Sequence, residues 1–361
     1  AQLPVGRFDF DSEVADISAD TPSVQTSAPT ATSRTPAGTY AWVTPMWIVV
    51  AAFALVTVFR SHQVGIPLRD PAGSVFRNRL ALSLALFAVF AAVDAGVRIG
   101  RRGWSFPRLG KELRRRWSKD RLVLVLSGIL AYHIVYVCYR NLKSWVAFRH
   151  PQDDHLLSFD KLLFAGHSPA VLLHDLLGEG AAAHILTVIY QSFGYLVPVS
   201  FVAALVFANQ IRQGYGALSA ALWAWIIGLG SYYLIPTLGP FWSASKEFAG
   251  LDPTEVTRTQ AKYLAERADL LAHPAAGDSF ARIGAFASLH VGFTCLILLM
   301  VRYYGFHRAP KVMTVYLVLI MISTVYLGWH FVVDDAAGLL LAYLAVNLGR
   351  FTVYGLRGRP S

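Results

Sequence analysis

The stretch VMTVYLVLIMISTVYLGW (residues 312–329) carries no charged side chain, and HFVVD (330–334) follows it directly. An apolar run of this length is typical of a helix that crosses a lipid bilayer. His330 and Asp334 stand at its outer end, and their separation of one helical turn places the carboxylate close to the imidazole. The stretch therefore predicts a membrane-spanning helix with a histidine and a carboxylate at one membrane boundary.

Seven further apolar segments extend this pattern along the chain. Hydrophobic residues make up 55% of the 361 residues and charged residues only 15%, whereas soluble domains carry about 25% charged residues. The sequence thus predicts an all-α polytopic membrane protein with about eight transmembrane helices, the last six of which form a core. The predicted spans are 43–60, 79–98, 122–142, 181–208, 217–236, 287–304, 312–329 and 335–352.

The distribution of basic residues predicts the orientation of these helices. Residues 101–121 are strongly basic, which the positive-inside rule places in the cytoplasm. The loops 143–180 and 237–286 then face the extracytoplasmic side. The net charge of +10 is explained by cytoplasmic loops, and no nucleic-acid partner is expected. Aromatic residues interleave with the basic ones, as suits a helix lying on anionic headgroups: Trp104, Phe106 and Trp117.

The chain divides into four predicted parts. Residues 1–40 are rich in Ser, Thr, Pro and Ala and are expected to form a disordered cytoplasmic tail. Residues 41–121 supply two transmembrane helices and the basic cytoplasmic loop, residues 122–352 the catalytic core, and residues 353–361 a basic cytoplasmic tail. The abundance of Ala and Arg favours a bacterial protein, and hence a plasma (inner) membrane location.

A second histidine motif, Ala287-Ser288-Leu289-His290, opens the predicted span 287–304 at the same extracytoplasmic boundary. A neutral imidazole can attack phosphorus while a carboxylate on its other nitrogen orients it, and a second imidazole can protonate the leaving oxygen. We therefore predict His330 as the nucleophile, Asp334 as its orienting partner and His290 as the general acid and base. The adjacent Asp335 is the less favoured alternative partner, because it points further round the helix.

Four residues are candidates for holding the phosphate. Ser288 and the free N–H groups at the start of its helix can bind a phosphate oxygen. Arg282, Arg140 and Lys143 are plausible counter-charges at the same membrane face, although a solvated loop charge and snorkelling helix-end anchors are the alternative interpretations. No cofactor or metal is expected, because the cysteines and remaining histidines show no ligand spacing.

Ser288-Leu289-His290 followed by His330-x-x-x-Asp334 resembles the type 2 phosphatidic acid phosphatase superfamily. Leu289 stands where glycine is commoner in that superfamily, which favours the branch containing inositol phosphorylceramide synthase, an inositolphosphotransferase. Residues 326–330 (YLGWH), 236–242 (PTLGPFW) and 160–169 are also similar to that branch. The resemblance implies the same roles for His330, Asp334 and His290, in a chemistry that uses no metal.

The expected function is a phosphotransferase that moves a phosphoryl-headgroup, with inositol phosphate as a candidate, through a phosphohistidine intermediate at the extracytoplasmic face. The donor would be a phospholipid or a polyprenyl phosphate, and the acceptor a lipid or glycan hydroxyl. Transfer of the group to water would instead make the protein a lipid-phosphate or polyprenyl-phosphate phosphatase. A transporter and a haem-binding membrane protein are the non-enzymatic alternatives.

Overall fold

The computed structural model describes residues 40–355 apart from 101, 102 and 104. The predicted tail at residues 1–40 lies outside these residues except for its last position, and so does most of the predicted tail at 353–361. Within the described ranges the chain is helical and contains no strand.

All eight predicted apolar segments are helices. They are α1 (Thr44–Val64), α2 (Arg77–Gly100), α4 (Lys119–Trp145), α7 (Ala181–Phe207), α8 (Ile211–Leu234), α11 (Leu289–Tyr303), α12 (Ala309–Tyr326) and α13 (Val332–Tyr354). Seven helices of the described chain are long and apolar enough to cross a membrane, whereas α11 has only 15 residues. The protein is thus an all-α polytopic membrane protein, with seven full-length helices and a short one in place of the expected eight.

Close approaches at small residues hold the bundle together. The helix α13 packs against α8 and α11, and α4 packs against α8 and α1. A Cβ atom added to Gly349 of α13 would lie 2.4 Å from the backbone nitrogen of Ala220 in α8. Small residues at such crossings let two helix backbones approach closely, which is how membrane helices gain van der Waals contact without a hydrophobic driving force.

The replacement Gly349→Ala is expected to destabilise the bundle by about 1–3 kcal/mol, because the added methyl group overlaps the α8 backbone. The check is the thermal unfolding midpoint of the purified protein in detergent. Gly230→Ala is the matched control, since a Cβ at Gly230 of α8 meets no atom within 4 Å. Equal midpoints for the two variants would contradict the close packing of α13 on α8.

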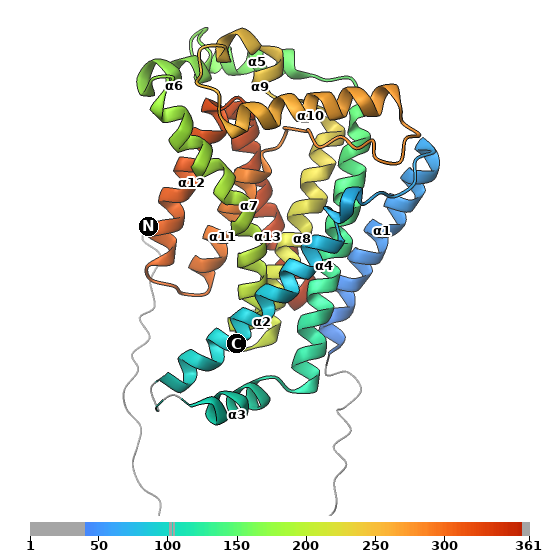
Figure 1. Cartoon of the computed structure of the whole chain (residues 1–361), viewed down its shortest axis with the longest axis vertical. Coiled ribbons are helices and arrows are strands. Elements are labelled where there is room, and N and C mark those ends of the chain that lie inside the picture. The colour runs from blue at the N-terminus through green and yellow to red at the C-terminus, as the bar shows by residue number, and fades with distance from the viewer. Residues whose placement is uncertain (1–39, 101–102, 104, 356–361) are drawn as a thin grey trace, which may run out of the picture. The chain divides into compact units, whose positions relative to one another are not determined.

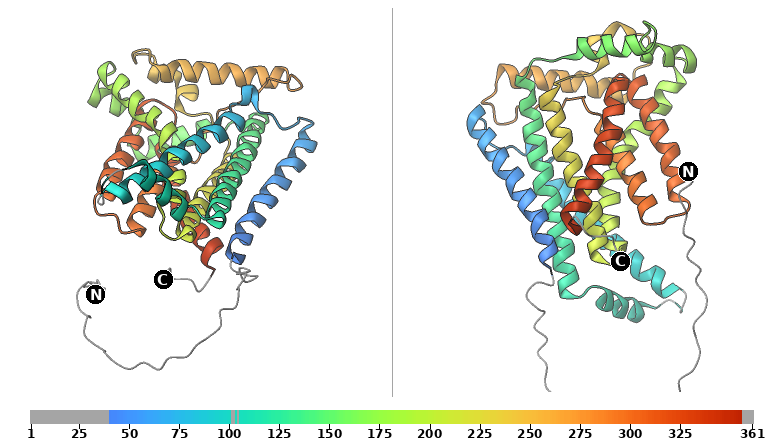
Figure 2. Two further views of the ribbon diagram at one scale, coloured as in Figure 1. Left: turned by 60° about the horizontal axis from the view of Figure 1, so that its bottom comes forward. Right: turned by 180° about the vertical axis from the view of Figure 1, so that it is seen from behind.

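A layer of short helices covers one end of the bundle (Figures 1 and 2). It consists of α5 (Asp153–Leu163), α6 (Pro169–Leu177), α9 (Pro240–Ser243) and α10 (Glu255–Ala272). These helices occupy the segments that the sequence suggested only as loops. The start of α10 is fixed by Thr254, whose hydroxyl accepts from the N–H groups of Val256 and Thr257.

The basic segment forms α3 (Phe106–Arg116), which lies at the opposite end of the bundle from this layer (Figure 1). Four short 3-10 turns complete the described chain, at Ala41–Val43, Pro71–Gly73, Val146–Phe148 and Ser245–Phe248. The helix predicted from the aromatic and basic residues of this loop is therefore present. The N-termini of α11 and α13, with the histidine motifs, lie at the covered end.

The end of α12 differs from the prediction, because the helix stops at Tyr326 rather than at residue 329. Gly328 has a φ of +73°, a conformation that a glycine adopts at little cost, and a Cβ there would lie 2.7 Å from Phe248. The N–H groups of Trp329 and His330 both donate to the carbonyl of Thr324. His330 therefore lies in a tight turn between two helices, and Asp334 lies in the first turn of α13.

Candidate active site

The imidazole of His330 faces the carboxyl group of Asp334, with Nδ1 and Oδ2 separated by 3.3 Å. Both side chains are buried, with exposed fractions of 4% and 0%. The same oxygen of Asp334 accepts from the N–H of Phe331 at 3.0 Å, so it acts as an acceptor. The proton of a neutral His330 ring then belongs on Nδ1, which leaves Nε2 with a free lone pair.

The neighbouring Asp335 has a different partner. Its Oδ2 accepts from the hydroxyl of Thr324 at 2.9 Å, and the side chain is 1% exposed. Of the two carboxyl groups, only that of Asp334 makes a hydrogen bond to His330. The geometry thus agrees with the preferred of the two candidate partners.

His290 stands in the first turn of α11, and its ring centroid lies 5.8 Å from that of His330. Two aromatic rings from α7 pack against it, Tyr190 at 4.4 Å and Phe193 at 4.3 Å between centroids. The three residues predicted for catalysis therefore meet at one place, although α11 and α13 approach it from different parts of the sequence.

Ser288 is fully buried and lies behind this site instead of facing it. Its hydroxyl caps α11 by accepting from the N–H of Val291 at 3.4 Å, and its own N–H donates to the backbone carbonyl of Asp334 at 2.9 Å. It is not among the residues that line the adjacent cavity. In this geometry Ser288 joins the starts of two helices and does not present its hydroxyl to a substrate.

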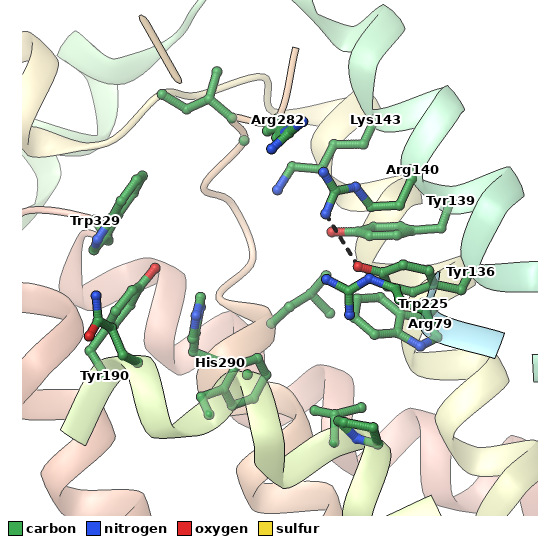
Figure 3. Close-up of a pocket in the computed structure, with 18 of the residues that line it drawn as sticks. Arg79, Tyr136, Tyr139, Arg140, Lys143, Tyr190, Trp225, Arg282, His290 and Trp329 are labelled. Carbon is green, nitrogen blue, oxygen red and sulfur yellow. Dashed lines mark hydrogen bonds between the residues drawn. The ribbon is translucent and has the colours of Figure 1, made fainter. Parts of the chain in front are cut away.

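A cavity of about 350 Å³ opens in front of the two histidines. Figure 3 shows the basic side chains following one wall, with His290, Tyr190 and Trp329 on the other side. No aspartate or glutamate is among the described residues that line it. Four arginine or lysine side chains line it: Arg79, Arg140, Lys143 and Arg282. A cavity with this charge suits an anionic ligand.

The three predicted counter-charges all reach this cavity. The Lys143 ammonium lies 4.9 Å from the ring centre of Tyr232. Arg282 pairs with Glu266 at 3.4 Å through Nε. Arg140 donates to the hydroxyl of Tyr136 at 3.2 Å and so is held in place through a neutral partner.

The sequence did not identify Arg79 or the aromatic walls. Arg79 lies near the start of α2, far in sequence from both motifs. Trp329 stacks on Tyr190 with the rings 3° from parallel and their centroids 5.8 Å apart. Tyr263 of α10 contacts the same indole, at 6.0 Å between centroids.

The helix α5 supports the turn that carries His330. The carboxyl group of Asp160 accepts from the N–H groups of Val332 at 2.7 Å and Val333 at 3.2 Å, which are unsatisfied donors at the start of α13. Asp153 likewise accepts from Leu238 and Gly239. Burial raises the pKa of both carboxyl groups, that of Asp153 to about 6, against the opposing effect of these backbone donors.

Burial also affects the pKa of His330. Removal from water, with the positive charge of Lys143 as a second cause, lowers the pKa of His330 to about 3. A lowered histidine pKa means that the neutral ring persists as the pH falls, until the pH approaches this value. His330 is therefore neutral throughout the physiological range, which is the state in which Nε2 is nucleophilic.

The replacement Asp160→Asn is expected to lower turnover about tenfold and to cost about 1–3 kcal/mol of stability, because two N–H groups lose a carboxylate acceptor. The turn with His330 then becomes less well fixed. Turnover and the thermal midpoint would be measured together. The control is Asp154→Asn on the exposed side of α5. If Asp160→Asn and Asp154→Asn behaved alike, α5 would not position the turn.

Comparison with known proteins places the chain in a family. A family model described as the PAP2 superfamily matches residues 154–348, more than half of the 361 residues. The matched region contains both histidine motifs and the helices that carry them. No curated protein and no solved structure matches the chain. Because this match covers more than half of the chain, the membrane protein belongs to the PAP2 superfamily.

Proposed function

We propose that this protein is a lipid phosphotransferase of the inositol phosphorylceramide synthase-like branch. It moves a phosphoryl-headgroup, such as inositol phosphate, from a phospholipid to a lipid or glycan hydroxyl. Members of the PAP2 superfamily are in general phosphatases and phosphotransferases. The observation that carries the proposal is the buried His330–Asp334 pair, which faces His290 at a cation-lined cavity.

The proposed first step forms a phosphohistidine. Nε2 of His330 attacks the donor phosphorus, and the bond between phosphorus and the lipid oxygen breaks. His290, in its protonated form, gives its proton to the departing oxygen. Asp334 stabilises the positive charge that develops on the His330 ring.

The second step reverses these roles. The acceptor hydroxyl gives its proton to His290 as its oxygen attacks phosphorus, and the bond between phosphorus and Nε2 breaks. His330 returns to its neutral state, and His290 is again protonated. Lys143 and Arg282 balance the negative charge of the phosphoryl oxygens in both steps.

We further propose that the site faces the extracytoplasmic side of a bacterial plasma membrane. The basic helix α3 lies at the opposite end of the bundle from the covering helices (Figure 1). Under the positive-inside rule that end is cytoplasmic. The site then lies where it meets lipids of the outer leaflet.

The covering helices favour transfer over hydrolysis. Val256, Thr259 and Tyr263 of α10 line the cavity, so one wall comes from a segment outside the membrane helices. Such a wall can recognise a polar headgroup and exclude water, which is what a transferase needs to protect its intermediate. A lipid-phosphate or polyprenyl-phosphate phosphatase is the alternative, in which water is the acceptor.

The test is an analysis of products. Wild-type and His330→Ala protein in detergent would be incubated with phosphatidylinositol, other phospholipids and polyprenyl phosphates, with and without lipid alcohols as acceptors. Phosphorus NMR and mass spectrometry would follow the phosphate. A phosphodiester on the acceptor that requires His330 supports transfer. Free phosphate or free phosphorylated headgroup supports the phosphatase, and the absence of any His330-dependent product refutes both.

A further inference from the structure

Two arginines converge on one tyrosine in the cavity wall. The Arg79 guanidinium of α2 lies 4.8 Å from the ring centre of Tyr136. The Arg140 guanidinium of α4 lies 5.9 Å from the same centre, and its Nη1 donates to the Tyr136 hydroxyl at 3.2 Å. One neutral side chain thus brings two positive charges from different helices close together.

No carboxylate compensates these charges. Within the described part of the chain, the ion pairs include neither Arg79 nor Arg140. The Nε of Arg140 is buried and has no hydrogen-bond partner there. Arg140 is half-buried and Arg79 is exposed, and two like charges that contact the same ring repel each other. An anion placed between them would remove this cost and take up the donors that remain open.

The position of this group separates it from the reacting centre. In Figure 3, Arg79 and Arg140 lie beside Tyr136, with Lys143 and Arg282 further along the same wall and His290 across the cavity. Arg79, Tyr136 and Arg140 also lie outside residues 154–348, which match the family model. Lys143 also lies outside this range, so the position along the cavity wall, and not the extent of the family match, separates the group from Lys143 and Arg282.

We infer that Arg79, Arg140 and Tyr136 form a second anion subsite, which binds a phosphate group other than the one that reacts. The inference rests on the proposed function for the identity of the reacting group. Lys143 and Arg282 then bind the reacting phosphoryl group, and Arg79 and Arg140 bind the other phosphate group. The substrates that occupy the cavity accordingly carry two phosphate groups, either both on the donor or one on each substrate.

The first test is a binding measurement that needs no turnover. Inorganic phosphate would be titrated calorimetrically into the full-length protein in detergent, with His330→Ala as a second background. The wild type and His330→Ala are expected to bind two phosphates per chain. Arg79→Gln should weaken one of them about tenfold or more, because a charge-assisted contact is lost. The matched control is Arg77→Gln, an arginine of the same helix that is exposed like Arg79 but does not line the cavity.

Each result bears on the subsite independently of catalysis. The inference is overturned if the wild type binds only one phosphate per chain. It is also overturned if Arg79→Gln binds two phosphates with wild-type affinity, even if His330 proves essential. Arg79→Lys keeps the charge and should retain part of the second affinity. If His330→Ala retained full turnover while the two-phosphate stoichiometry held, the proposed mechanism would fail and the subsite would stand.

A second test locates the additional phosphate. The specificity constant kcat/KM of Arg79→Gln would be compared with that of the wild type for donors with and without a phosphate monoester on the headgroup. The same comparison would be made for acceptors with and without one. A loss of about tenfold confined to the phosphorylated donor, or to the phosphorylated acceptor, assigns the group to that substrate. Equal values for all pairs would rule out a second phosphate in the reaction.

Discussion

Replacing His330 with alanine is expected to abolish turnover and the formation of any phosphorylated enzyme. The ring lines the cavity, and one of its nitrogens is hydrogen-bonded to Asp334. Without it, the proposed mechanism loses its covalent route, and what remains is the smaller effect of binding and of the cation-lined wall. Single-turnover experiments with a phosphorus-labelled donor, quenched in base to preserve phosphohistidine, would show the loss directly.

The control for this prediction is His167→Ala, an exposed histidine between α5 and α6. It should retain wild-type turnover. His330→Gln is a second variant, which keeps a polar side chain in the turn and tests whether loss of activity reflects misfolding. A His330→Gln protein with a wild-type thermal midpoint and wild-type turnover would refute the nucleophile assignment.

The second large effect is expected for Asp334→Asn, which should lower kcat about a thousandfold with little change in KM. The amide oxygen can accept from Phe331 and from Nδ1 of His330, as one carboxyl oxygen does now. It carries no negative charge, however, to balance the positive ring that forms during the proposed attack. The measurement is kcat together with the amount of phosphorylated enzyme at steady state.

Asp335→Asn is the control that tests whether the loss of kcat is specific to Asp334. The two carboxyl groups are adjacent and equally buried, but Asp335 contacts Thr324 and not His330. Its replacement should lower the thermal midpoint and leave kcat within about tenfold of the wild type. A larger kcat loss for Asp335→Asn than for Asp334→Asn would exchange the roles of the two residues.

The helices could be predicted from the sequence because a helix that crosses a membrane requires a long run of apolar residues. Every predicted apolar segment is a helix, and their order places both histidine motifs at the same end. The boundaries were less accurate where backbone turns decided them. The early end of α12 depends on the positive φ of Gly328 and its contact with Phe248, which an apolar run does not reveal.

The motif residues were predictable and most of the cavity was not, for a physical reason. His330 and Asp334 are neighbours in sequence, so their chemistry is visible locally. Much of the cavity wall comes instead from α2, α4, α7 and α10, and nothing in the sequence near Arg79 or Tyr190 indicates that they line the same cavity as His290. Ser288 shows the opposite case: its motif position suggested a ligand, but the crossing of α11 and α13 buries its hydroxyl.

The depth at which α11 begins has a consequence for how a lipid reaches the site. Its first N–H groups lie level with Asp334 in α13, and His290 stacks on Tyr190, about 13 Å along α7 from its start at Ala181. Under the proposed function, the phosphate of a lipid that enters from the covered end would pass this length of α7 before it reaches His290. Such a path would remove water from the phosphate charge, and the four cations that line the cavity would compensate for this loss. We then expect the rate of the proposed reaction to depend on bilayer thickness and on lipid packing.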